Sequence, residues 1–260
     1  MYLEANSLET LTAFVKAIDD NEVALEEILN LYEEASEIDS KVYGNNHPRY
    51  ALRISRVGAA YVDMAVSSGR AGLLEKAETL HLEALGIIED TVERQELQED
   101  ALIIYLHDLS RTLLASGKSS EAKKHLERCL EIAEKYLVSA SPALVTIFEF
   151  LGYALVYDRI GKWAAVKYFG KARKIAEALG MRERFLITTF NLATSLAISG
   201  REFEAENYRQ QVIRQVSLEQ IVQYTERFHS FTKGIPPNDL MKAAREALKE
   251  IVEIRKREEL

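Results

Sequence analysis

The sequence predicts an all-α protein, and three observations lead to that prediction. Apolar residues recur at the spacing of one helix face: within 121–137, Ala122, Leu126, Cys129 and Ala133 form a stripe with Glu and Lys between them. No stretch alternates apolar and polar residues between turn residues, as a half-buried strand would. Four Pro and 12 Gly in 260 residues are too few for a disordered or loop-rich chain.

The starts of the predicted helices carry residues that satisfy unpaired backbone N–H groups. Ser217 and Gln220 have the spacing of a capping box, and Ser119 is expected to act as a simple N-terminal cap. Pro48 and Pro142 can begin a helix but cannot continue one. With these starts, the apolar periodicity predicts helices over residues 7–18, 21–40, 48–68, 72–91, 95–116, 119–137, 142–160, 162–179, 182–199, 201–215, 218–233 and 239–258.

The connections are short, so consecutive helices are expected to fold back on each other as antiparallel hairpins. These hairpins repeat, because the turn glycines Gly72, Gly117, Gly161 and Gly200 lie 45, 44 and 39 residues apart. Each glycine is expected to end the first helix of its hairpin in a left-handed cap. A single hairpin leaves an apolar face exposed, so only a stack of several hairpins is stable.

Small residues in the first helices would allow the two helices of each hairpin to approach closely. When the hairpins are aligned on their turn glycines, these positions are Gly58, Ser110, Ala154 and Ala193. Larger residues on either side are expected to pack against the neighbouring hairpin. The pattern is weakest in the first hairpin, before residue 44.

Charge is distributed unevenly along the chain. Residues 1–40 carry 11 acidic side chains against the single basic residue Lys16, a net of −10, whereas the whole chain has a net charge of −8. Residues 118–184 are basic, with 13 Lys and Arg against 8 Asp and Glu. These segments could steer a partner or pair between copies of the chain. The alternative is that they are solvated faces of amphipathic helices.

This arrangement resembles the tetratricopeptide repeat over nearly the whole chain. The spacing is similar to that of the longer kinesin-light-chain-type variant, which favours a Gly-x-x-His-Pro loop, and Gly44-Asn45-Asn46-His47-Pro48 matches that loop. Ser141-Pro142 occupies the equivalent place two hairpins later, and Asn191-Leu192-Ala193 matches the asparagine-containing start of that variant. The resemblance implies a right-handed superhelical solenoid of about five hairpins, closed by a C-terminal pair of helices.

The same resemblance implies one continuous domain over residues 1–260. Its expected parts are an acidic N-terminal hairpin at 1–40, core repeats at 41–216 and capping helices at 217–260. The segment 239–258 has an apolar stripe and a dense polar face, which suits a solenoid cap. Two other interpretations stay open for this segment: it could mediate a homodimer, or it could dock into the groove as an autoinhibitory plug.

Solenoids of this family have a concave groove lined by the first helices of their hairpins, which usually holds a peptide or helix of a partner. The resemblance implies that Asn191 pairs with the backbone of an extended peptide. It also implies that Arg56, Arg111 and Arg159 bind carboxylates of the partner. The alternative is that Asn191 bonds to a neighbouring helix and the arginines form surface ion pairs. The expected groove residues are Arg56, His107, Asp108, Arg111, Leu155, Arg159, Phe190, Asn191 and Thr194.

Several other functions lack support in the sequence. Gly117-Lys118-Ser119 copies the end of a phosphate-binding loop, but Thr112 stands where the earlier glycine is required. The five histidines never occur at metal-binding spacing, and Cys129 is the single cysteine, so no metal or other cofactor is expected. The lysine stripe in 167–174 lies on a second helix of an acidic chain, so nucleic acid is not expected as a partner.

The sequence therefore predicts a cytoplasmic, non-enzymatic adaptor that binds a peptide or helix of another protein. It carries no signal peptide, no apolar run long enough to span a membrane, and no convergent set of catalytic groups. The alternative is a peptide-sensing signalling regulator whose superhelix changes shape on binding, which ligand-induced compaction in scattering would support. An enzyme is the third class, and it would require a pocket of convergent ionisable groups.

Overall fold

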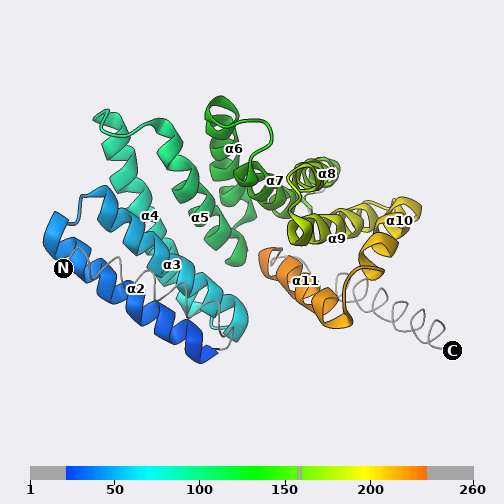
Figure 1. The fold of residues 1–260 in the computed structure, drawn as a ribbon, viewed down its shortest axis with the longest axis horizontal. Helices are drawn as coiled ribbons and strands as arrows, with labels where there is room; N and C mark the ends of the chain where they lie inside the picture. The colour runs from blue at the N-terminus through cyan, green and yellow to red at the C-terminus, as the bar shows by residue number, and fades with distance from the viewer. Residues whose placement is uncertain (1–21, 157, 159, 233–260) are drawn as a thin grey trace. The chain divides into compact units, whose positions relative to one another are not determined.

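The structure is a computed structural model that describes residues 22–156, 158 and 160–232, and these residues form helices joined by turns (Figure 1). No strand occurs in that part of the chain, and the prediction of an all-α fold is confirmed. The predicted helices 7–18 and 239–258 lie outside the described residues. The helices are α2 (Glu22–Tyr43), α3 (Pro48–Ser68), α4 (Gly72–Glu93), α5 (Leu102–Ala115), α6 (Ser119–Tyr136), α7 (Pro142–Leu155), α8 (Lys162–Ala178), α9 (Arg182–Ile198), α10 (Glu202–Ile213) and α11 (Leu218–Phe231).

The described residues fall into two compact units, 22–139 and 140–232. The first unit holds the hairpins α3–α4 and α5–α6, with α2 packed against α3. The second holds the hairpins α7–α8 and α9–α10, followed by α11. We call α3, α5, α7 and α9 the first helices and α4, α6, α8 and α10 the second helices. The single domain over 1–260 stays a prediction.

The predicted helix starts at 48, 142 and 218 are confirmed. The side chains of His47 and Ser141 cap the helices that begin with Pro48 and Pro142. Ser217 and Gln220 form the expected reciprocal capping box. The prediction for Ser119 is wrong: it is the first residue of α6, and Lys118 precedes the helix without a side-chain cap.

Two of the four predicted left-handed glycines are confirmed and two are wrong. Gly117 and Gly200 have φ of 79° and 80° after the first helices α5 and α9. Gly72 begins α4 instead, because Gly69, with φ of 71°, already ends α3. Gly161 has φ of −75° and precedes α8.

The turn before α8 is held by a carboxylate rather than by a left-handed glycine. Oδ1 of Asp158 accepts hydrogen bonds from the backbone N–H groups of Ile160 (2.8 Å) and Gly161 (3.0 Å). An aspartate side chain that binds the following backbone N–H groups mimics a backbone turn. The helix α7 ends at Leu155 rather than at the predicted residue 160.

The close contact between the helices of a hairpin is confirmed at Gly58 and is shifted by two residues in α7. A Cβ atom on Gly58 would lie 2.6 Å from Nε2 of His81 in α4. In α7 the equivalent contact belongs to Gly152, where a Cβ atom would lie 2.5 Å from Cε1 of Phe169 in α8. Ala154, predicted for this role, is only half-buried. Alignment on Gly161 misplaced the register because this turn is built differently from the others.

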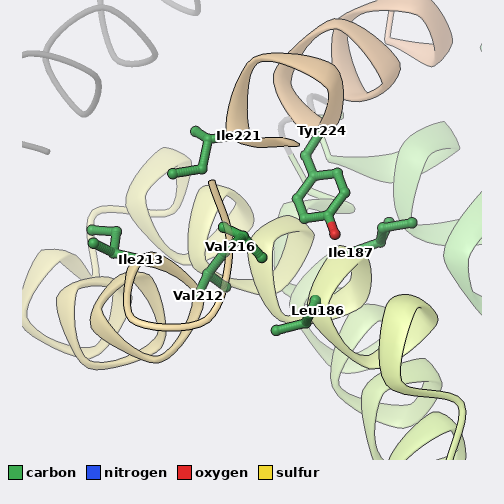
Figure 2. Close-up of a cluster of buried hydrophobic side chains, with 7 residues drawn as sticks. All are labelled: Leu186, Ile187, Val212, Ile213, Val216, Ile221 and Tyr224. Atoms are coloured by element: carbon green, nitrogen blue, oxygen red, sulfur yellow. The ribbon is translucent and has the colours of Figure 1, made fainter. Parts of the chain in front are cut away.

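Figure 2 shows how the beginning of α11 attaches to the last hairpin. Ile221 and Tyr224 of α11 lie in one buried apolar cluster with residues of α9, α10 and the connecting turn. The other members of this cluster are Leu186, Ile187, Val212, Ile213 and Val216. This contact covers the apolar face that the last hairpin would otherwise expose.

Gly152→Ala is expected to destabilise the protein by about 1–3 kcal/mol, because the new methyl group meets the ring of Phe169 in a close-packed core. The matched control is Gly170→Ala in α8, where a Cβ atom meets nothing within 4 Å. The control should stabilise the chain by up to about 1 kcal/mol through helix propensity. Urea unfolding of both variants measures the difference. Equal effects would contradict the close approach of α7 and α8.

Candidate partner-binding surfaces

In the first unit, the predicted residues of α3 and α5 lie together on a polar surface. The guanidinium of Arg111 in α5 forms an ion pair with Asp63 of α3. Ser55 Oγ of α3 donates a hydrogen bond to Asp108 Oδ2 (3.0 Å), and His107 Nδ1 lies 3.3 Å from Asp108 Oδ1. Side chains from two neighbouring first helices are thereby held in fixed positions.

The charged groups on this surface are paired and only partly exposed. The side chains of Arg111 and Asp63 are 21% and 29% exposed, and those of His107 and Asp108 are 20% and 14% exposed. Burial alone would raise the pKa of Asp108, but the hydrogen bond with His107, together with the charge of Arg111, holds that pKa below its ordinary value. Asp108 is therefore an ionised anchor for the basic groups around it.

Beneath this surface, His81 of α4 joins the two first helices. Its Nδ1 lies 2.8 Å from Thr112 Oγ1 of α5, and its Nε2 lies 3.1 Å from the backbone carbonyl of Ser55 in α3. The carbonyl can only accept, so Nε2 donates and Nδ1 is left to accept from the threonine in the neutral ring. Burial lowers the pKa of His81 below its ordinary value, against the opposing effect of Asp108. The buried imidazole ring of His81 is therefore neutral.

In the second unit, Asn191 of α9 lies inside the protein rather than on an open surface. Its side chain is buried, and Nδ2 donates to the hydroxyl of Tyr153 (2.8 Å) and to Glu149 Oε1 (3.3 Å), both of α7. Its Oδ1 has no hydrogen-bond partner among the described residues. The arrangement matches the alternative in which this amide bonds to a neighbouring helix.

Glu149 is the centre of a buried polar cluster that includes two arginines. The carboxylate is fully buried, and Tyr153 donates its hydroxyl proton to Oε1 (2.7 Å). Arg184 of α9 reaches Oε2 (3.1 Å), and Arg227 of α11 reaches Oε1 (3.5 Å). Burial alone would lower the pKa of Arg227, but Glu149 raises it above its ordinary value. The charge of the buried carboxylate is compensated from two other helices.

The end of α11 covers this cluster with two phenylalanine rings. The centroid of Phe228 lies 5.6 Å from that of Tyr153 and 6.2 Å from that of Phe169. Phe231 lies 5.6 Å from Tyr153 and 5.0 Å from Phe150. Both rings of α11 are buried. In the second unit, the chain's own helix therefore packs on the first helices α7 and α9.

The contact of α11 is polar in part, and its polar atoms are incompletely paired. Among the described residues, the buried atoms without a hydrogen-bond partner include Ser195 Oγ and Asn191 Oδ1 of α9 and Tyr224 OH and Arg227 Nε of α11. Each such group costs about 1–3 kcal/mol when it is removed from water without compensation. This cost offsets part of the stabilisation that comes from burying the aromatic rings.

The remaining predicted groove residues have varied environments. Leu155 is buried, and Phe190 is half-buried with its ring centroid 6.0 Å from that of Tyr224 in α11. The hydroxyl of Thr194 donates to the backbone carbonyl of Phe190 in its own helix (3.0 Å). Arg56 is half-exposed on α3. Arg159 lies outside the described residues. That these residues bind a partner stays a prediction.

The cluster around Glu149 and the packing of α11 on it were not predicted from the sequence. One signal was present: Glu149 is the single charged residue in the apolar segment 142–155. A lone acidic residue there has to find a basic partner elsewhere in the fold. Sequence alone does not say which arginine supplies it.

Within residues 22–156, 158 and 160–232, no three His, Cys, Asp or Glu side chains are grouped so that they could hold a metal ion. None of the described helices is long and apolar enough to cross a membrane.

The described helices are thus arranged as repeated antiparallel hairpins, with close contacts at Gly58 and Gly152. This arrangement defines the class of helical repeat proteins. Comparison with known proteins agrees with that class. A family model described as a tetratricopeptide repeat matches residues 102–143, which include α5 and α6. Comparison with curated proteins found no match.

Two similar solved structures come from Podosopora anserina and are described as kinesin light chain nearly identical TPR-like repeats, one a point variant of the other. Each is 20% identical to this chain and covers 80% of it, and 94% of each solved chain is matched, with TM-scores of 0.61 and 0.60. The resemblance to tetratricopeptide repeat proteins of the kinesin-light-chain type is confirmed, as is the predicted class of helical solenoid. The family match supports a protein-interaction scaffold in general.

Acidification is expected to destabilise the protein through His81. Because the folded-state pKa of His81 is lowered, the unfolded chain binds more protons as the pH falls below 6.5. Stability is retained above that pH and falls below it, by at most about 1.4 kcal/mol for each pH unit from this group. His81→Gln should flatten that dependence in urea unfolding measured over a pH series. An unchanged slope would contradict a buried neutral ring.

The thiol of Cys129 is expected to be unreactive in the folded chain. It is buried, its Sγ donates to the backbone carbonyl of Ile103 (3.4 Å), and burial raises the pKa of the thiol to about 12. Labelling by a disulfide reagent at mildly alkaline pH should become fast only in concentrated guanidinium chloride. Rapid labelling of the native protein would mean that α6 opens readily.

Proposed function

We propose that the chain binds a peptide or helical segment of a partner protein on the surface formed by α3 and α5. The observation that carries this proposal is that the side chains of Arg56, His107 and Arg111 keep exposed parts on two adjacent first helices. Arginines held in place offer paired N–H donors to a carboxylate of a partner. In the second unit, by contrast, α11 already packs on the first helices.

The partner chemistry that suits this surface is an acidic segment, since its exposed parts include two guanidinium groups and an imidazole. Asp63 forms an ion pair with Arg111, Asp108 lies within hydrogen-bond distance of His107, and these contacts fix the positions of Arg111 and His107. An acidic side chain of the partner would compete with Asp63 for Arg111. The proposal therefore includes a rearrangement of that ion pair on binding.

The proposed role is that of a non-enzymatic adaptor in the cytoplasm. A single buried cysteine without a disulfide suits a reducing compartment. A homodimer through the segment 239–258 is part of the same proposal, and that segment lies outside the described residues. The peptide-sensing regulator remains the alternative prediction.

A double variant, Arg56→Ala with Arg111→Ala, is expected to weaken binding of the partner roughly tenfold or more, because two charge-assisted contacts are lost. The matched control is Arg128→Ala on the second helix α6, where the arginine forms an exposed ion pair with Glu89. The partner is first captured from source-cell lysate, and its affinity for each purified variant is then measured by titration calorimetry.

A photo-crosslinker placed at position 56, with one at position 128 as the control, locates the contact independently of affinity. Crosslinks from position 56 alone, together with weakened binding of the double variant, would support the proposal. Equal losses in the double variant and in Arg128→Ala, or crosslinks from position 128 alone, would overturn it.

A further inference from the structure

The beginnings of the second helices α8 and α10 carry large apolar side chains that are exposed to solvent. Ile160, in the turn before α8, is 87% exposed. Trp163 and Phe203, the second residues of α8 and α10, are 53% and 85% exposed. Side chains of these types are more often buried, and a group of them on one surface marks an interaction site.

The three side chains belong to one surface, because α8 and α10 lie side by side with their beginnings at the same end. Near those beginnings, Cζ of Arg201, the residue before α10, lies 6.0 Å from the centroid of the Trp163 ring. Further along both helices, Arg173 of α8 donates a hydrogen bond to Gln211 of α10 (3.4 Å). We call the surface formed by Ile160, Trp163, Arg201 and Phe203 the tip patch.

The charged groups at the tip patch include both signs. Arg201 forms an ion pair with Glu204, and these side chains are 37% and 48% exposed. Glu202, which pairs with Arg209, is 65% exposed. The carboxylates disfavour an anionic membrane, and a partner of a single charge sign would meet like charges as well as opposite ones. A second copy turned by a two-fold rotation sets Arg201 opposite Glu204 in both directions.

We propose that the tip patch is the interface of a two-fold symmetric homodimer. In such an interface both copies use the same surface, so Phe203 of one protomer packs against Ile160 of its partner. Arg201 of one protomer faces Glu204 of its partner, and Trp163 is covered by the contact. This inference goes beyond the function proposed for α3 and α5, concerns a different surface from the segment 239–258, and does not depend on either.

The size of the tip patch limits the strength of the dimer. Stable, specific interfaces bury about 800 Å² on each partner. A buried aromatic side chain contributes about 150–250 Å², so two aromatic rings and one isoleucine supply less than that area. We therefore expect a dissociation constant on the order of 10–100 μM, at the weak end of specific protein association.

Trp163 is the single tryptophan of the chain, so its fluorescence reports on this interface without any substitution. Acrylamide quenching and sedimentation velocity are measured on the full chain from about 1 to about 300 μM, a range that spans the expected dissociation constant. Formation of the dimer should lower the quenching constant about twofold or more, because the contact excludes water from the ring. A chain that stays monomeric, or that dimerises without a change in quenching, would overturn the proposal.

Two substitutions remove the apolar anchors without altering the core, because both side chains are exposed in the monomer. Ile160→Ser and Phe203→Ser should each raise the dissociation constant of the dimer roughly tenfold. The matched control is Leu82→Ser on α4 of the first unit, whose side chain is 50% exposed, and this variant should dimerise as the native chain does. Equal dimerisation of all four chains would place the interface elsewhere, for example in the segment 239–258, and would overturn the proposal.

A charge exchange between two different chains tests the two-fold pairing itself. Arg201→Glu sets like charges opposite each other in its own dimer, and so does Glu204→Arg. Each variant alone should dimerise roughly tenfold more weakly than the native chain, whereas an equimolar mixture should form a heterodimer with about the native affinity. A mixture that stays as monomeric as the separate variants would overturn the assigned interface.

A lipid surface is the other occupant that exposed apolar side chains would suit. Vesicles of phosphatidylcholine, with and without phosphatidylserine, are sedimented with the native chain and with Phe203→Ser. The proposal predicts that neither chain sediments with the vesicles. Binding of the native chain that Phe203→Ser loses, without a dimer in solution, would assign the tip patch to lipid and overturn the proposal. Failure of the crosslinks at position 56 would leave all these results untouched.

Discussion

A carboxylate buried in an apolar helix has to be compensated by its neighbours, and Glu149 imposes this condition on residues 140–232. Taking a charge out of water costs several kcal/mol unless ion pairs and hydrogen bonds replace the lost hydration. Here Asn191 and Arg184 come from α9 and Arg227 comes from α11, so one carboxylate joins three helices. Removing the carboxylate would leave two arginines facing an apolar cluster. The position of α11 thus depends on the ion pair between Arg227 and Glu149 as well as on the packing of its apolar face.

A buried pair plays a related part in residues 22–139. Arg53 Nε of α3 donates to Asp39 Oδ2 of α2 at 2.7 Å, and both side chains are almost completely buried. Such a pair adds little net stability compared with apolar packing, but it disfavours arrangements that would leave either charge alone. The polar pairs therefore fix which helix faces meet, while Gly58 and Gly152 let the paired helices approach.

Local chemistry made most of the fold predictable, and contacts between distant residues made the site unpredictable. Periodicity, Pro48, Pro142 and the Ser217 capping box located the helices because each acts within a few residues. The register of α7 was wrong because Asp158 builds a turn that alignment on glycines does not detect. Asn191 is buried against Tyr153 and Glu149, which lie 38 and 42 positions away in the sequence. No rule of local residue spacing predicts such a contact.

The claim on which this account depends most is that the end of α11 lies on α7. Nuclear Overhauser contacts between the ring protons of Tyr153 and those of Phe228 and Phe231 test it directly in the full chain. Both contacts are expected, since each phenylalanine centroid lies 5.6 Å from that of Tyr153. Phenylalanine ring resonances at random-coil chemical shifts, without Overhauser contacts to Tyr153, would contradict it.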